Sequence, residues 1–151
     1  MRKVRRQESA AHCNCSPVKR SGKRLNRQDD SHRRGETVPI CTFCRIVKKE
    51  LPAKVLYEDD LCLAFEDINP KAPTHVLIVP KMHIESVDAL QDSDASALGH
   101  LFLVARDLAR LKAIHLTGYR TVVNTGPQAG QSVFHIHVHL MGGRRMGWPP
   151  G

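Results

Sequence analysis

The sequence lacks a long hydrophobic run, and this argues against a membrane-spanning helix. Its apolar segments, such as Val76 to Val79, have the length of a strand, whereas a bilayer takes about 20 consecutive apolar residues. The N-terminus also lacks the apolar segment of a secretory signal. We therefore expect no membrane partner, and a disulfide framework is disfavoured. The five cysteines, an odd number, suit metal binding or free thiols better.

Acidic residues are scarce in the first 40 positions, which contain 11 Lys or Arg and 4 Asp or Glu. These positions account for +7 of the formal net charge of +8. Positions 41–151 carry 12 basic and 11 acidic residues, a net charge of +1. A basic surface over the whole chain would indicate nucleic acid as a partner. Because the charge is confined to one end, nucleic acid is disfavoured as a partner of the remaining domain.

Large apolar side chains are almost absent from residues 1–38, so this segment cannot bury enough surface to offset its ordering entropy. We interpret residues 1–38 as a basic, disordered N-terminal extension and residues 39–151 as one folded domain. The Arg- and Ser-containing extension resembles an organelle transit peptide, although its acidic residues argue against that class. The expected location is the cytoplasm, or the cytoplasm and nucleus. The alternative is mitochondrial or plastid targeting through the extension.

Hydrophobic periodicity and turn residues predict two helices and five strands in the domain. The predicted helices cover residues 41–50 and 94–113. The predicted strands cover residues 54–58, 61–66, 75–80, 119–124 and 133–141. This order favours an α+β fold in which one sheet carries its helices on one face.

Three histidines in one predicted strand form the sharpest feature of the sequence. His135, His137 and His139 alternate with apolar residues, so the three imidazoles share one face of the strand. The outer two lie about 13 Å apart along it, too far to converge on one zinc ion. Such a row suits an extended anion such as a phosphate chain, where a neutral histidine can be a nucleophile and a charged one can hold oxygens.

A glycine-rich loop over residues 126–132 directly precedes this row. Glycine lets backbone N–H groups approach phosphate oxygens, and the Ser132 hydroxyl can donate a hydrogen bond to a leaving atom. No carboxylate cluster typical of a Mg²⁺ site is evident, so we expect no cofactor to be required for catalysis. Cys41 and Cys44 form a CxxC pair, whose spacing suits zinc or redox chemistry, or simply two buried thiols.

Together these segments resemble the histidine triad (HIT) superfamily, and in particular its Hint branch. The resemblance covers residues 41–151 and rests on several separated motifs in the same order. Those motifs are residues 51–54, 57–60, 72–75, 99–101, 118–120, the triad segment 130–139 and the ending 142–151.

The resemblance implies a five-stranded antiparallel sheet with two helices, and a homodimer in which the sheet continues from one chain into the other. It implies hydrolysis of purine nucleoside phosphoramidates such as adenosine 5′-monophosphoramidate, with AMP- or GMP-type nucleotides as ligands. Two alternatives stay open. One is a nucleotide-binding adaptor with little turnover, and the other is a different HIT reaction such as dinucleoside polyphosphate hydrolysis.

The resemblance also assigns roles to single residues. His137 matches the nucleophile that forms a nucleotidyl-histidine intermediate, and His139 matches the phosphate-binding histidine. His135 and Ser132 complete the implied catalytic set. Further implied nucleotide contacts are Phe43, Ile46, Phe65, Asp67 (ribose hydroxyls), Ile68, Asn124, Gly130, Gln131, Val133 and Trp148, the last reaching the partner's active site.

In bacterial-type relatives the CxxC pair joins two histidines around a structural zinc. The matching positions imply a zinc site of Cys41, Cys44, His75 and His135, which leaves His137 and His139 free for phosphate. Glu66 and Asn69 depart from the residues common in the family's nucleoside pocket. These departures leave open which base and which acyl group are preferred.

Overall fold

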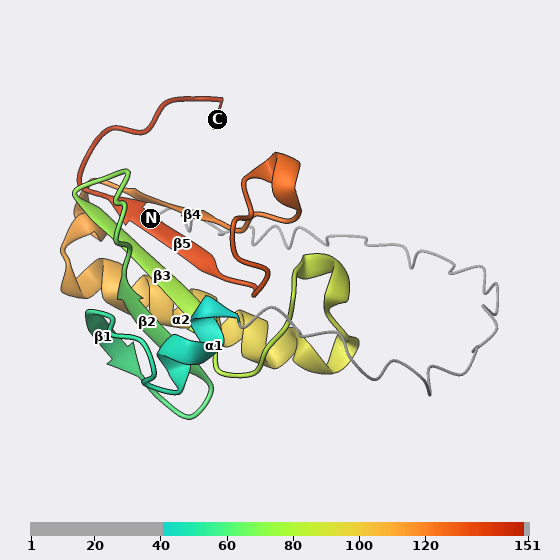
Figure 1. Ribbon diagram of the computed structural model, residues 1–151. Helices are drawn as coiled ribbons and strands as arrows, with labels where there is room; N and C mark the ends of the chain where they lie inside the picture. The colour runs from blue at the N-terminus through green and yellow to red at the C-terminus, as the bar shows by residue number, and fades with distance from the viewer. Residues whose placement is uncertain (1–40, 150–151) are drawn as a thin grey trace, which may run out of the picture. The chain divides into compact units, whose positions relative to one another are not determined.

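A computed structural model describes residues 41–149 (Figure 1). In this part of the chain, five antiparallel strands form one sheet in the order β1-β2-β3-β5-β4. The α+β architecture with two helices is thereby confirmed, while the predicted extension 1–38 lies outside the described residues. The helices and strands are α1 (Thr42–Val47), β1 (Val55–Glu58), β2 (Cys62–Glu66), β3 (Thr74–Pro80), α2 (Ala95–Leu111), β4 (Tyr119–Val122) and β5 (Val138–Gly142).

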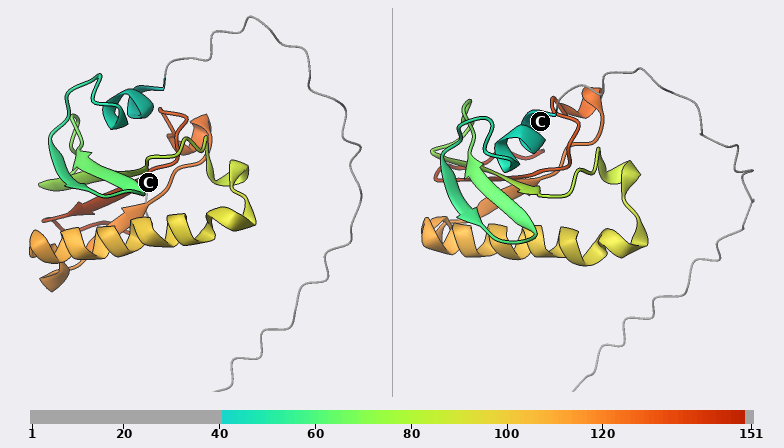
Figure 2. Two further views of the ribbon diagram at one scale, coloured as in Figure 1. Left: turned by 90° about the horizontal axis from the view of Figure 1, so that it is seen from below. Right: turned by 60° about the horizontal axis from the view of Figure 1, so that its bottom comes forward.

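The two helices cover opposite faces of the sheet, so the expectation of helices on one face is wrong. Side chains alternate along β3. Val76 and Ile78 pack with α2, whereas Leu77 and Val79 pack with Phe43 of α1. Figure 2 shows α1 and α2 on the two sides of the sheet. The domain therefore has two cores, which we call the α2 core and the α1 core.

Helix α2 follows its predicted range closely because its apolar period is long and regular. It begins after a capping box in which the Asp94 carboxylate accepts the backbone N–H of Gln91 at 2.9 Å. Its buried face consists of Leu101, Val104, Ala105, Leu108 and Ala109. Within residues 41–149, neither this helix nor any other has the length and apolar character needed to cross a bilayer.

Strand β5 is shorter than the predicted strand over 133–141. Before Val138 the chain leaves the ladder, because the N–H of His135 donates to the Val133 carbonyl at 2.9 Å and that of Ile136 donates to the Ile84 carbonyl at 2.6 Å. His135 and His137 therefore lie in irregular backbone before β5, where side chains do not have to alternate between the two faces of a strand. This departure determines the geometry of the site.

The far end of β5 is tightly packed. A Cβ placed on Gly142 would lie 2.7 Å from Cδ1 of Ile114, in the short 3₁₀ turn Ile114–Leu116 (η3). Only a residue without a side chain allows this turn to lie against the strand.

A hydrogen-bonded cluster ties the β1–β2 turn to α2. The Asp59 carboxylate accepts hydrogen bonds from the Tyr57 hydroxyl at 2.8 Å, from His100 Nε2 at 2.6 Å and from the backbone N–H groups of Leu61 and Cys62. Burial works against ionisation of Asp59, but these donors outweigh it and hold its pKa well below the usual range. Burial also raises the pKa of the neighbouring Cys62 thiol to about 12. The cluster is therefore a satisfied structural network.

Candidate active site and metal centre

A cavity of about 240 Å³ lies between α1, the end of β2 and the start of β5. Its walls are mostly apolar, and the imidazoles of His137 and His139, the Ser132 hydroxyl and the Asp67 carboxylate supply polar groups. An apolar pocket with a few convergent polar groups is the usual form of a small-molecule site. The predicted residues that line it are Phe43, Ile46, Phe65, Asp67, Ile68, Ser132, Val133, His137 and His139.

His137 is oriented by a backbone contact. Its Nδ1 lies 2.7 Å from the carbonyl oxygen of His135. A carbonyl oxygen only accepts, so in the neutral ring Nδ1 carries the proton and Nε2 keeps its lone pair. The ring is only 4% exposed and meets the Phe43 ring edge-on, with 5.1 Å between centroids. His137 is thus held in the tautomer that a nucleophile needs.

His139 is oriented by a chain of hydrogen bonds that runs through His75. The backbone N–H of Lys71 donates to His75 Nδ1 at 3.1 Å, which places the proton of neutral His75 on Nε2. That Nε2 lies 2.9 Å from Nδ1 of His139 and donates to it. The proton of His139 is therefore on its Nε2, a buried atom with no hydrogen-bond partner among the described residues. His139 presents a fixed donor beside His137, whose ring centroid is 4.8 Å away.

The imidazoles of His139 and His75 are neutral near pH 7. Burial, together with the neighbouring His137 and His75 and against the opposing charge of Asp67, lowers the pKa of His139 to about 4. Burial likewise lowers the pKa of His75, again opposed by Asp67. Since neither ring is protonated in this range, the direction of the hydrogen-bond chain is unambiguous.

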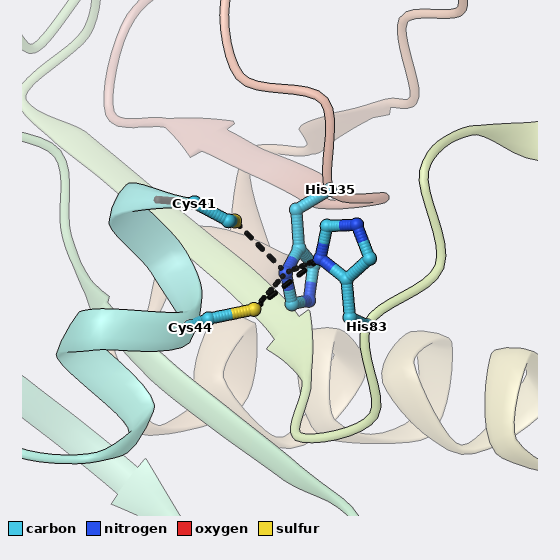
Figure 3. Close-up of side chains that lie close together, drawn as sticks. All are labelled: Cys41, Cys44, His83 and His135. Carbon is cyan, nitrogen blue, oxygen red and sulfur yellow. Dashed lines mark hydrogen bonds between the residues drawn. The ribbon is translucent and has the colours of Figure 1, made fainter. Parts of the chain in front are cut away.

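A second cluster, which we call the metal centre, consists of Cys41, Cys44, His83 and His135 (Figure 3). All four possible ligand atoms lie within 4.8 Å of one another. His135 Nδ1 lies 3.4 Å from Cys41 Sγ, and Cys44 Sγ lies 3.2 Å from His83 Nδ1. The two Nδ1 atoms are 3.2 Å apart. Tetrahedral zinc with ordinary bond lengths gives about 3.3 Å between two nitrogens and about 3.6 Å between nitrogen and sulfur.

The chemistry of the donors also fits zinc. His135 Nε2 donates to the Pro80 carbonyl at 2.9 Å, which leaves Nδ1 unprotonated and free to bind a metal. Burial raises the pKa of the Cys44 thiol, and Cys41 raises it further. A thiolate at Cys44 is therefore favoured by a cation beside it. A bound zinc would be closed by four protein ligands, as in structural sites.

His75 does not belong to this centre, so the ligand set expected from the sequence needs correction. In the β3–β5 ladder His75 lies opposite Met141, six residues from His135 in the sequence, and its ring nitrogens contact the Lys71 N–H and His139 Nδ1 instead. The same antiparallel register carries the chain beyond β3 back alongside the segment that precedes β5. His83 is thereby brought to His135, and pairing the two predicted strands in the sequence could have located it.

His135 likewise differs from its expected catalytic role. One ring nitrogen faces the cysteines and the other faces Pro80, and the ring does not line the cavity. Its connection to the active site is its carbonyl oxygen, through which it orients His137.

Four further expected nucleotide contacts do not line the cavity. Gln131 is buried and its side chain binds backbone, accepting from Gly126 N at 2.8 Å and donating to the Glu85 carbonyl at 2.7 Å. This residue closes the glycine-rich loop rather than facing the cavity. Trp148 is 87% exposed. The other two residues outside the lining are Asn124 and Gly130.

Known proteins are similar to this chain in sequence and in fold. The HIT domain family matches residues 48–146. A 14 kDa zinc-binding protein from Zea mays is 50% identical over 111 residues, which cover 72% of this chain and 86% of that protein.

Solved structures agree with this assignment. A HIT family hydrolase from Legionella pneumophila superposes with a TM-score of 0.72 at 48% identity, covering 74% of this chain and 99% of that one. A histidine triad nucleotide-binding protein from Candida albicans has a TM-score of 0.63 at 32% identity, covering 74% and 84%. With the matched sequence, the superposed fold and the three histidines in agreement, the chain belongs to the HIT domain family.

Proposed function

We propose that the protein hydrolyses purine nucleoside phosphoramidates, with His137 as the nucleophile. The observation that carries the proposal is the orientation of this imidazole. Its Nδ1–H is held by the His135 carbonyl, so the Nε2 lone pair is available beside the Nε2–H donor of His139. A nucleophile and an oxyanion donor on neighbouring residues suit phosphoryl chemistry.

The reaction takes two displacements. In the first, His137 Nε2 attacks the phosphorus, a P–N bond to the ring forms, and the substrate's P–N bond breaks. The leaving nitrogen takes up a proton from solvent and departs as an amine, and the hydroxyl of Ser132, which lines the cavity, can donate a hydrogen bond to it. In the second, water attacks the phosphorus and gives up a proton to solvent, the bond to His137 breaks, and a nucleoside monophosphate is released. His139 Nε2–H stabilises the charge on the phosphate oxygens in both steps.

The remaining cavity suits a nucleoside. Its apolar walls, formed in part by Phe43 and Phe65, can take the flat faces of a purine. The Asp67 carboxylate can accept hydrogen bonds from ribose hydroxyls. Its Oδ1 receives the N–H of Asn69 at 2.8 Å, which leaves further acceptor positions. We therefore propose AMP- and GMP-type nucleotides as ligands, in line with the nucleotide-binding name of the Candida albicans relative.

We also propose that the metal centre holds zinc and that this zinc is structural. The interatomic distances support it, and the Zea mays relative is named as a zinc-binding protein. Zinc there would join α1 to the loop after β3 and to the segment before β5, without contact to the phosphate.

A homodimer formed through β4 is part of the proposal. This strand lies at the edge of the sheet, and an open edge can pair with another chain. Apolar side chains are exposed nearby on α2 and β4, namely Phe102, Leu103 and Tyr119. Size-exclusion chromatography with light scattering tests the homodimer. A measured mass equal to that of one chain at micromolar concentration contradicts it.

A substrate panel tests the activity. Hydrolysis of an adenosine phosphoramidate, of its guanosine counterpart and of a diadenosine polyphosphate is compared for the wild type and His137→Ala. We expect the phosphoramidates to be preferred and the variant to lose about 10⁴-fold or more of the rate while it still binds AMP. The matched control is His115→Ala, since His115 is exposed on η3 away from the cavity. Normal hydrolysis by His137→Ala refutes the mechanism, and a preference for the polyphosphate refutes the reaction class.

A further inference from the structure

His135 belongs to the metal centre through its ring and to the active site through its backbone. Its Nδ1 lies 3.4 Å from Cys41 Sγ and 3.5 Å from Cys44 Sγ. Its carbonyl oxygen accepts the Nδ1–H of His137 at 2.7 Å. A displacement of His135 therefore changes the orientation of the neighbouring imidazole.

Phe43 makes a second connection, since it lies between the two cysteines in the sequence. Its ring, only 6% exposed, meets the His137 ring at 5.1 Å and 81° and the Phe65 ring at 5.6 Å and 68°. The same ring lines the cavity. The cysteines thus fix the position of a side chain that touches His137 and forms part of the pocket wall.

Helix α1 is too short to be stable alone. It has six residues, and its N-cap, Cys41, makes no side-chain capping hydrogen bond. An isolated helix of this length is not populated to a useful extent in water. Its position therefore depends on what anchors it to the rest of the domain.

We infer that the metal centre is a positioning device for the nucleotide site, because its ligands hold α1 and the His135 backbone against His137. A metal there joins three segments that are distant in sequence, at residues 41–44, 83 and 135. Loss of the metal releases α1, opens one wall of the cavity and weakens nucleotide binding. The last step rests on the proposed function, whereas the release of α1 does not.

The effect is confined to one face of the sheet. The α2 core consists of residues from α2, η3 and the inner positions of β2, β3 and β5, none of which is a ligand of the metal centre. Phe43 belongs to the separate α1 core on the other face. The sheet and α2 therefore stay folded when the metal is removed.

The test compares the full chain loaded with zinc, freed of zinc by a chelator under reducing conditions, and reloaded. Hydrogen exchange followed by mass spectrometry reports on α1, and calorimetry with AMP reports on the pocket. Without zinc we expect exchange in residues 41–47 to accelerate about tenfold or more while residues 95–111 are unchanged. The dissociation constant for AMP should rise about tenfold, the equivalent of one lost aromatic contact. Zinc should restore both.

Single variants distinguish the effect of losing a metal ligand from the effect of changing the cavity wall. Cys44→Ser should lose zinc and reproduce the zinc-free protein in both measurements. Phe43→Leu should keep zinc and bind AMP more weakly. The matched control is Arg45→Ala, since Arg45 is in the same helix and its guanidinium pairs with Glu50 at the surface. This variant should bind zinc, show the same slow hydrogen exchange in residues 41–47 as the wild type, and bind AMP with unchanged affinity.

Unchanged exchange in residues 41–47 after zinc removal overturns the inference, as does a chain that takes up no zinc. Unchanged AMP affinity with accelerated exchange overturns the link to the pocket. If the loaded chain binds no AMP at all, the proposed function fails, and the exchange measurement still decides whether the metal positions α1.

Discussion

Replacement of His75 tests whether the hydrogen-bond chain behind His139 serves the reaction. In the structure, His75 Nε2–H donates to His139 Nδ1 at 2.9 Å and so keeps the His139 proton on Nε2, the nitrogen that we propose binds the phosphate. His75→Phe keeps a ring of similar size and removes this donor. Because one hydrogen bond contributes about 1 to 1.5 kcal/mol, we expect kcat to fall about tenfold. Direct loss of an oxyanion donor, as in His139→Ala, should cost more, about 10²- to 10³-fold.

The assay combines steady-state hydrolysis of an adenosine phosphoramidate with ¹⁵N NMR of the histidine rings, which reports the tautomer of His139. His75→Gln should recover part of the rate, because its amide N–H can reach the position of the lost Nε2–H. Lys71→Ala is the control, since the hydrogen bond to His75 comes from the backbone N–H of Lys71, which the variant keeps. A wild-type kcat in His75→Phe, or an Nδ1–H tautomer of His139 in the wild type, refutes the reasoning.

Three further predictions concern the metal centre and the scaffold. His83→Ala should lower the zinc content measured by elemental analysis well below one per chain, whereas His75→Ala should keep it; the reverse result would restore the ligand set expected from sequence. Asp59→Asn should lower the free energy of unfolding in urea at pH 7 by about 1 to 2 kcal/mol, because several donors lose an ionised acceptor. The pKa of Asp59 is lower in the folded than in the unfolded chain, so its contribution to the free energy of unfolding is complete above the unfolded pKa and is lost as the pH falls below it. The difference in free energy of unfolding between the wild type and Asp59→Asn should therefore shrink in acid. A difference that stays constant down to pH 2 contradicts this. Gly142→Ala should lower the free energy of unfolding by about 1 to 3 kcal/mol, because the new Cβ would lie 2.7 Å from Ile114. Adding Ile114→Val should recover part of this loss. An unchanged urea midpoint in the single variant would show that η3 moves away from β5 without cost.

The sequence predicted best what depends on local pattern. The apolar repeat of Leu101, Ala105 and Leu108 matches the buried face of α2, whereas Phe102 and Leu111 of the same repeat are exposed. Resemblance to a family supplied nine of the nucleotide-site residues that line the cavity.

Prediction from the sequence was wrong where contacts between distant segments determine the structure. Alternation along β3 shows two buried faces but not which helix covers each, so the prediction that both helices share one face is wrong. The hydrogen bond from the Ile136 N–H to the Ile84 carbonyl keeps the segment before β5 out of the sheet. The hydrophobic periodicity of the sequence does not indicate this contact. Gln131 shows the same limit, since only the folded loop reveals that its amide binds backbone.

The three histidines of the motif are not chemically equivalent. His137 presents a lone pair, His139 presents an N–H donor, and both ring nitrogens of His135 point away from the cavity. What His135 gives the active site is a main-chain carbonyl, which every residue type carries. A cysteine at position 135 could thus still offer zinc a ligand and orient His137, so this position should tolerate substitution in ways that the other two do not. Under the proposed function, the repeated His-x-His-x-His pattern is a catalytic pair preceded by a structural ligand, and the apparent symmetry of the sequence conceals three separate roles.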